Sequence, residues 1–541
     1  MTIEHQKNTH QKLNKRYVEH VRRWADIILE VGKDRYGNEQ SPLFTDGIHV
    51  KNLDPLTWKS QGENWILSNL ASQQNWFRTL YGLTELTGDS RYAEAARKAT
   101  AYALQNIRYG KLMAWGGHMA YNLIDKKIVH AADKGPQHEL KCHYPFYELM
   151  LEIDPNETLA MIEAMWDSHI SDWNNLEFNR HGQPRVQYAG YGSGKVWDRN
   201  YREDPVFFTG KGLTFINAGS DLYYAAAFIG SKMGLEAPIV WAERLAARYA
   251  ETANPKTGMT GYQFSISVLP GQRGDRAIEQ FGEQLADDRP IEATLSTPSQ
   301  IQTIVGKAAL CRMAIFDMLG ERGRTFLDWA IADQLAYGRW AYEEAENEFH
   351  PILTNGRRLT NLVLEKDGYY GRQGKELKAM KANGFLFWAY ASGYRRSNHS
   401  ELWHIVRSMA VGLGLGDINE AGQCLYSDRI NSINSSDPYI LFGLLELAEI
   451  YPNGPFLTMA QRIGDNITAD RWYHSFFIPS ERHLYAKFDT IEPLALLHLD
   501  AAIRGERNRM PRYFGGSSFF SAAYDERGHT SDSYFYYSCV D

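Results

Sequence analysis

A two-helix unit recurs along most of this chain, and it limits the available folds more than any other feature. Each unit is an apolar stretch with helical spacing, a short turn containing Gly, Asp or Pro, and a second apolar helical stretch. The units occupy residues 81–102, 147–166, 223–249, 318–330, 393–409 and 444–463. Because a helical hairpin buries only one face by itself, each unit must pack against its neighbours.

Stacked helical hairpins form either an open solenoid or a closed toroid. A further amphipathic helix at 17–31 brings the number of expected pairs to about six or seven. The units are irregular, and long aromatic loops separate them, which favours a closed toroid over an open scaffold of the tetratricopeptide type. We therefore predict one domain over residues 1–541 that is dominated by α-helices, with a few short strands in its loops.

The two ends of the chain lie outside this pattern. Residues 1–14 are polar, and we expect them to form a disordered arm. They contain no apolar core of a signal peptide, so we expect a cytoplasmic protein without a membrane anchor. The four cysteines are far apart in the sequence, which fits reduced thiols in that compartment. The tail at 515–541 is aromatic, and we expect it to pack on the barrel.

The formal net charge of −7 argues against a nucleic-acid or anionic-membrane partner. An acidic polymer would also be repelled by the molecule as a whole, so it would need a local basic cleft. We expect a monomer.

Possible metal ligands and an arginine are grouped between residues 115 and 182. His118, Glu139 and His181 offer two imidazoles and a carboxylate, which suit a borderline divalent metal. Arg180 directly precedes His181, and its planar charged fork suits a carboxylate ligand. None of these residues has the tight spacing of ligands on one helix, so the alternative is that they are surface or capping residues.

The spacing of these four residues resembles that of family 2 polysaccharide lyases. Glu139 follows His118 by 21 residues (139 − 118), and Arg180 follows Glu139 by 41 (180 − 139), with His181 next. In that family the His, Glu and second His hold a metal, and the Arg is the catalytic base. The resemblance implies an (α/α)7 barrel and a pectate lyase or exopolygalacturonate lyase of the cytoplasmic type. Such an enzyme cleaves α-1,4-polygalacturonate or oligogalacturonides by β-elimination.

β-Elimination from a uronate removes the C5 proton and places negative charge on the C6 carboxylate, which a metal ion can stabilise. The nitrogen ligands disfavour calcium, so we expect Mn²⁺, with Co²⁺, Ni²⁺ or Fe²⁺ able to substitute. The resemblance implies that Arg180 is the base. A free guanidinium has a pKa above about 12, so the alternative is that Arg180 only binds the carboxylate.

The remaining candidates for substrate binding are chosen by residue type and by their place in loops or near the motif. Stacking on a sugar face is possible for the aromatic ones, with core packing as the alternative. The candidates are Lys141, Arg185, Arg199, Arg273 and Arg276, and the aromatic residues Trp115, Tyr121 and Tyr188.

Three segments offer material that could block one end of a cleft: 255–290, 355–374 and the tail at 515–541. A blocked cleft predicts an exo-acting enzyme that releases unsaturated digalacturonate. Two other readings remain open. One is a different (α/α)-toroid enzyme, a glycoside hydrolase or sugar epimerase, and the other is a non-enzymatic helical scaffold that binds sugars.

Overall fold

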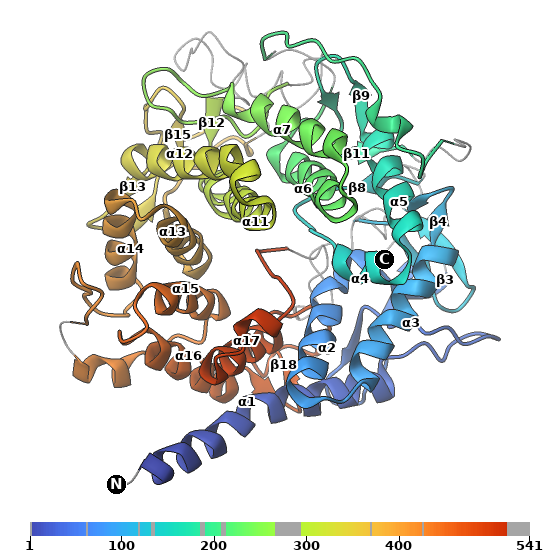
Figure 1. Ribbon diagram of the computed structural model, residues 1–541, viewed down its shortest axis with the longest axis horizontal. Helices are drawn as coiled ribbons and strands as arrows, with labels where there is room; N and C mark the ends of the chain where they lie inside the picture. Colours follow the sequence, from blue (N-terminus) through green and yellow to red (C-terminus); the bar gives the residue numbers. More distant parts are fainter. Residues whose placement is uncertain are drawn as a thin grey trace.

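The computed structural model describes residues 3–60, 63–116, 119–130, 136–183, 190–206, 212–265, 294–367, 370–424 and 427–516. Helices dominate it and form two concentric rings (Figure 1). The inner helices are α2 (Gln74–Thr87), α4 (Tyr147–Ile153), α6 (Ile216–Met233), α11 (Ala309–Leu319), α13 (Gly384–Ser397), α15 (Pro438–Ile450) and α17 (Glu492–Arg504). The outer helices are α1 (Ile3–Val31), α3 (Arg91–Asn106), α5 (Pro155–His169), α7 (Glu236–Ala250), α12 (Arg324–Trp340), α14 (Ser400–Gly412) and α16 (Phe456–Asp470).

Each inner helix packs on the outer helix that follows it, and α17 packs on α1. The described part of the chain thus contains seven helix pairs, and the predicted helical toroid is confirmed. Short capped turns join the helices of a pair. Gly88 ends α2 in the left-handed region (φ 76°), and Asp154 caps α5 by accepting a hydrogen bond from the Glu157 backbone N–H.

Helix α1 closes the ring. It lies beside α17, while α17 also packs on α2 and α15, so the first and last α-helices of the described residues form the seventh pair (Figure 1). Because α1 begins at Ile3, the backbone of residues 3–14 is helical, which corrects our expectation of a disordered arm. The physical reason is that no Gly or Pro interrupts residues 3–31, so helix propagation meets no breaker.

The described parts of the long connections lie on the face where the inner helices begin. The turns within pairs lie on the other face, because the two helices of a pair run antiparallel. The long connections carry antiparallel strands, the largest sheet having the order β2-β3-β6-β7.

The strands are β1 (Gly47–His49), β2 (Thr57–Ser60), β3 (Glu63–Ser68), β4 (Arg108–Tyr109), β5 (Leu112–Met113), β6 (Met119–Asn122), β7 (Lys127–His130), β8 (His138–Glu139), β9 (Ile170–Asp172), β10 (Glu177–Phe178), β11 (His181–Gly182), β12 (Leu295–Ser296), β13 (Tyr342–Glu343), β14 (Glu348–Phe349), β15 (Ile352–Leu353), β16 (Met380–Lys381), β17 (Trp472–Tyr473), β18 (Phe476–Phe477) and β19 (Tyr485–Lys487). The short helices are η1 (Leu70–Ser72), η2 (Lys195–Trp197), α10 (Pro298–Ile301), η4 (Gln302–Ala308, a π-helix), η5 (Gly320–Gly323), η6 (Ser427–Ser432) and η7 (Arg507–Arg509).

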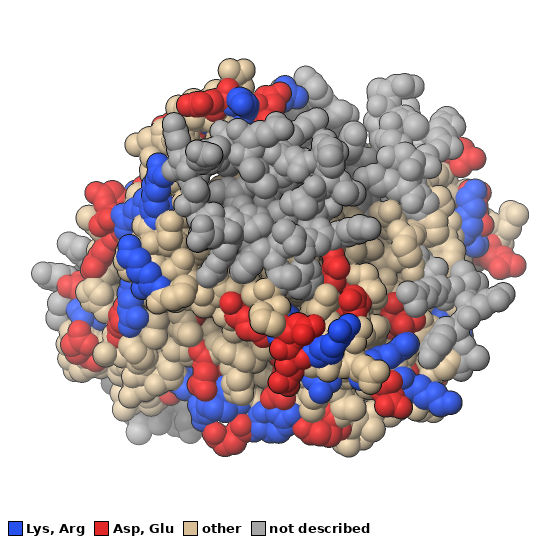
Figure 2. Space-filling model, turned by 90° about the horizontal axis from the view of Figure 1, so that it is seen from above, with Lys and Arg blue, Asp and Glu red and all other residues tan. Residues whose placement is uncertain are grey.

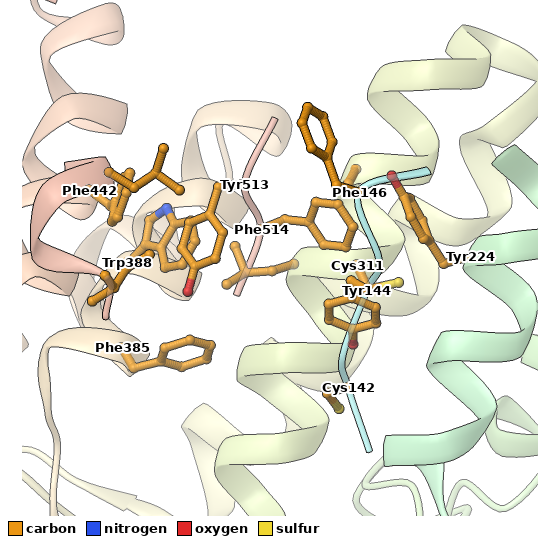
Figure 3. Packing of buried hydrophobic residues seen from close by; sticks show 14 of the residues in the cluster. Cys142, Tyr144, Phe146, Tyr224, Cys311, Phe385, Trp388, Phe442, Tyr513 and Phe514 are labelled. Atoms are coloured by element: carbon orange, nitrogen blue, oxygen red, sulfur yellow. The ribbon is translucent and has the colours of Figure 1, made fainter. Parts of the chain in front are cut away.

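The segment after α17 crosses the centre of the ring and fills it. The Phe514 ring lies 4.8 Å from that of Tyr144 and 4.6 Å from that of Tyr224, and the Tyr513 ring stacks on Trp388 at 5.5 Å (Figure 3). The toroid therefore has a packed core and not an open channel. Of the tail at 515–541, residues 517–541 lie outside the described residues.

On the face drawn in Figure 2, Lys and Arg side chains are interspersed with Asp and Glu. The described residues there form no extended field of one sign. Among the described helices, none is long and apolar enough to cross a membrane.

Candidate active site

Strands β8 and β11 bring Glu139 and His181 together. The two strands are antiparallel, with Glu139 directly opposite His181, so both side chains project from the same face of the ladder. Oε1 of Glu139 lies 3.4 Å from Nε2 of His181 and 3.5 Å from Nη1 of Arg180. Glu139 is buried, whereas the other two side chains are partly exposed. Three of the four predicted catalytic and metal-binding residues are thus neighbours in space.

The loop before His118 is held against Glu139. The backbone N–H of Glu139 donates to the Trp115 carbonyl at 3.2 Å, and Gly116 has a φ of 104°. A Cβ atom on Gly116 would lie 2.6 Å from the Glu139 carbonyl oxygen, so only glycine fits this approach. His118 itself lies outside the described residues.

Two buried polar residues, Asn69 and Asp46, hold this loop in place through hydrogen bonds. The Asn69 side chain donates to the Gly116 carbonyl at 3.0 Å, and its own backbone N–H donates to the Asp46 carboxylate at 2.6 Å. Burial raises the pKa of Asp46 to about 7. Neither residue could be identified from the sequence, because isolated Asn and Asp residues belong to no motif.

Two histidines, His138 and His169, contact each other next to the β8–β11 pairing. The ring nitrogens Nδ1 of His138 and Nε2 of His169 are 2.8 Å apart, and Nδ1 of His169 lies 2.6 Å from the Asn179 carbonyl oxygen. A carbonyl oxygen only accepts, so His169 donates from Nδ1 and accepts from His138 at Nε2. Burial lowers the pKa of His169 to about 4 and that of His138 well below its usual value, so both rings are neutral at neutral pH. The pair fixes Asn179, the residue before Arg180.

Arg180 is held by its backbone and directed by an aromatic ring. Its N–H donates to the Leu213 carbonyl and its carbonyl accepts from Leu140, each at 3.2 Å. The guanidinium lies 5.7 Å from the centre of the Phe215 ring, and its buried Nε has no hydrogen-bond partner among the described residues. The terminal nitrogens are therefore the part of Arg180 directed toward Glu139.

The loop after Glu139 wraps around a buried carboxylate. Cys142 (φ 58°) and Tyr144 (φ 44°) both adopt the left-handed region, which is rare for residues other than glycine. Asp221 of α6 accepts a hydrogen bond from the Tyr144 backbone N–H at 2.9 Å. Burial raises the pKa of Asp221 to about 7, against the opposing effect of the backbone N–H groups of this loop. Asp221 thus holds the loop that carries Lys141.

The arrangement fits a shared metal ion. Two donor atoms bound at about 2.1 Å to one ion with a tetrahedral angle lie about 3.4 Å apart. Nε2 of His181 and Oε1 of Glu139 have this separation. Among the described residues no group of three His, Cys, Asp or Glu side chains forms a metal site, and the third predicted ligand, His118, is not one of them.

The other candidates are divided between the core, the surface and undescribed segments. Trp115 is 3% exposed and Tyr121 is 4% exposed, so neither has an open ring face, and we no longer expect them to stack on a sugar. Both fill the hydrophobic core, the alternative stated for them. Arg199 lies 3.4 Å from the Asp167 carboxylate and over the Trp173 ring, which accounts for its position without a substrate. Lys141 is partly exposed beside Glu139. Arg185, Tyr188, Arg273 and Arg276 lie outside the described residues.

The structure is a helical toroid with Arg180, Glu139 and His181 clustered on its long-loop face. The family model of periplasmic pectate lyases matches residues 41–523, so the chain belongs to this family and is a polysaccharide lyase. A pectate disaccharide-lyase of Dickeya dadantii (strain 3937) is 28% identical over 510 residues, which cover 91% of this chain and 90% of that protein.

Some solved structures show a more distant similarity. A GH76 α-mannanase of Bacteroides thetaiotaomicron has a TM-score of 0.42 and 9% identity, covering 90% of this chain and 96% of that one. A cellobiose 2-epimerase of Bacillus thermoamylovorans B4167 has a TM-score of 0.42 and 8% identity, covering 91% and 100%. These similarities are too distant to bear on activity.

Proposed function

We propose that this protein is a metal-dependent pectate lyase that cleaves α-1,4-polygalacturonate or oligogalacturonides by β-elimination. The observation that carries the proposal is the β8–β11 bridge, which sets His181 opposite Glu139 with Arg180 beside both. Membership of the pectate lyase family and the name of the Dickeya relative support polygalacturonate as the substrate.

In this reaction the C5–H bond and the C4–O4 bond break, and a double bond forms between C4 and C5. Arg180 contacts the uronate and, starting from the neutral guanidine form, accepts the C5 proton on a terminal nitrogen and becomes a guanidinium; this nitrogen is at the end of the side chain that is directed toward the site. The departing O4 takes a proton from water, and the product carries a conjugated 4,5-unsaturated uronate.

His118, Glu139 and His181 would hold the metal ion through two imidazole nitrogens and a carboxylate. Bound there, Mn²⁺ in preference, or Co²⁺, Ni²⁺ or Fe²⁺, supplies positive charge to the C6 carboxylate as a Lewis acid. Three protein ligands leave positions open for the substrate, as in catalytic metal sites in general.

We further propose exo action with release of unsaturated digalacturonate. Residues of the connection between α12 and α13 pack with Leu295 of β12 in a separate hydrophobic cluster, so this connection is a packed segment of the long-loop face. The cluster comprises Leu295, Leu353, Leu359, Leu364, Tyr370 and Leu377. The disaccharide named in the Dickeya relative supports this product. A cytoplasmic enzyme acting on imported oligomers would fit this mode, and cell fractionation tests the location.

The function is tested by ultraviolet absorbance during incubation with polygalacturonate. We expect an increase from the unsaturated product, its loss on treatment with a chelator, and its recovery with Mn²⁺. Release of reducing ends without the absorbance would indicate a hydrolase and overturn the proposal.

A further inference from the structure

A buried histidine at the end of an outer helix holds both backbone groups of the residue before Arg180. His169 is the last residue of α5 and is 2% exposed. Its ring donates from Nδ1 to the Asn179 carbonyl oxygen at 2.6 Å, and its own carbonyl accepts from the Asn179 backbone N–H at 3.0 Å. Two hydrogen bonds from one residue thus fix Asn179 relative to the end of α5.

Asn179 transmits this constraint to the two residues that follow it. The Asn179 carbonyl and the Arg180 N–H belong to one planar peptide unit, and this N–H donates to the Leu213 carbonyl at 3.2 Å. Both polar atoms of the unit are therefore hydrogen-bonded, which fixes the direction in which the Arg180 side chain leaves the backbone. The Asn179 side-chain oxygen also accepts from the His181 backbone N–H at 2.9 Å.

Strand β11 packs directly on the His169 ring. A Cβ atom on Gly182 would lie 2.6 Å from Nε2 of His169, so only glycine allows this approach. One residue further on, the Gln183 N–H donates to the Ser168 carbonyl at 3.3 Å. Residues 179–183, which include the candidate base and one candidate metal ligand, therefore follow the end of α5 closely.

His138 fixes the orientation of the His169 ring. Because His169 donates from Nδ1, its Nε2 accepts the hydrogen bond from Nδ1 of His138. His138 precedes Glu139 on β8, and both rings are buried, so water does not compete for these contacts. Hydrogen bonds thus connect the strand that carries Glu139 to the peptide unit that precedes Arg180.

We propose that His169 is a positioning residue of the lyase reaction, which sets the Arg180 guanidine for removal of the C5 proton through the hydrogen bond from Nδ1 to the Asn179 carbonyl. This inference rests on the proposed function. His169 itself contacts no substrate and transfers no proton. Its contribution is the distance and orientation of the base, which act on the chemical step more than on binding.

The two ring nitrogens of His169 can be tested separately with amide side chains. The amide nitrogen of Asn takes the place of Nδ1, whereas the longer Gln places its amide near Nε2 and leaves the Asn179 carbonyl without its donor. We expect His169→Gln to lower kcat by about 10- to 100-fold, with KM and the Mn²⁺ dissociation constant little changed. His169→Asn should recover most of kcat. A role in folding alone would not give this difference between the two variants.

The measurements use the full chain with polygalacturonate and saturating Mn²⁺ in the absorbance assay, and calorimetry with Mn²⁺. His498→Gln is the matched control, since this histidine of α17 packs on the Phe442 ring at 5.3 Å and belongs to another helix pair. It should leave kcat unchanged, even where it lowers stability. If His169→Gln does not fold, ¹⁵N NMR of ring-labelled histidines in the wild type takes its place, with the His169→Asn spectrum assigning the signal.

The outcomes separate this inference from the proposed function. If the wild type forms unsaturated product and His169→Gln keeps its kcat, the inference is overturned and the lyase stands. Equal losses of kcat and Mn²⁺ binding in both His169 variants, or a His169 ring protonated at Nε2 and not at Nδ1, also overturn the inference alone. If the wild type forms no unsaturated product, both are overturned.

Discussion

Glu139 is the residue on which the candidate site depends most, since Nε2 of His181 and Nη1 of Arg180 both lie within 3.5 Å of one of its oxygens. We predict that Glu139→Gln, which keeps the size and removes the charge, lowers Mn²⁺ affinity and lyase activity by at least about 100-fold. Calorimetry with Mn²⁺ and the absorbance assay measure the two effects. The control is Glu94→Gln on the exposed side of α3, and unchanged Mn²⁺ binding in Glu139→Gln would contradict the assignment.

We predict that the catalytic role of Arg180 can be separated from metal binding by substitution. Arg180→Lys keeps a positive charge but loses the planar fork and its terminal nitrogens. We expect lyase activity to fall by more than about 100-fold while Mn²⁺ affinity changes little, because the side chain is not a ligand. Single-turnover absorbance with saturating substrate, alongside Mn²⁺ titration, checks this. Activity close to wild type would leave Arg180 with an electrostatic role only.

The raised pKa of Asp221 predicts that the stability of the folded protein depends on pH. Its pKa of about 7 in the folded state lies above the ordinary value of 3.8, so the folded protein retains this proton to higher pH than the unfolded chain. The stabilisation from the neutral form is full below about pH 4 and is lost as pH rises through about 7. Asp221→Asn lacks this titration and still accepts from Tyr144. Urea unfolding should show the variant gaining up to roughly 4 kcal/mol relative to wild type between pH 4 and 8; a pH-independent difference would refute it.

At the scale of elements, ring closure depends on α1. Trp24 is fully buried, with its ring 5.0 Å from Trp76 and 6.1 Å from Phe477. The Tyr17 hydroxyl also donates to the Asp465 carboxylate of α16 at 2.8 Å. Helix α1 therefore contacts both α2 and the segment around α16, on either side of the closure of the ring.

We predict that Trp24→Ala destabilises the protein by about 3–5 kcal/mol, through lost burial and the cavity that remains. Chemical denaturation followed by circular dichroism measures the change. Arg23→Ala, one position away on the exposed side of α1, is the matched control and should change stability by less than about 0.5 kcal/mol. Equal effects of the two substitutions would show that α1 does not close the ring.

For the whole molecule, the segregation of long connections to one face determines where a polymer can bind. The centre of the ring is filled by Tyr513 and Phe514, so a substrate chain cannot thread through it and must lie across the long-loop face. The packed cluster between α12 and α13 stands on that face.

This geometry leads us to predict exo action on long polygalacturonate. Early samples analysed by anion-exchange chromatography should contain one short unsaturated product, with slow loss of viscosity. An open groove would cut at internal positions instead, and an early ladder of product sizes with a rapid fall in viscosity would show that. Trimming by a contaminating enzyme is controlled with Arg180→Ala prepared in parallel.

Much of the architecture was predictable from local patterns. Apolar residues at helical spacing, with Gly88, Asp154 and Pro155 at the turns, located the helix pairs because these signals act within one or two turns of chain. The order of His118, Glu139, Arg180 and His181 could likewise be read from sequence spacing, although their proximity could not.

What only the tertiary structure decided involves residues far apart in sequence. Helix α17 pairs with α1, and Phe514 lies in the centre of the ring, because these contacts remove apolar side chains from water. Trp115 and Tyr121 are core residues for the same reason, since residue type alone does not distinguish a buried ring from a sugar-stacking one. The amino-acid sequence by itself thus determined the helical units and the order of the catalytic candidates. The tertiary structure decided ring closure and the Glu139–His181 bridge, because each needs long-range packing that no local pattern encodes.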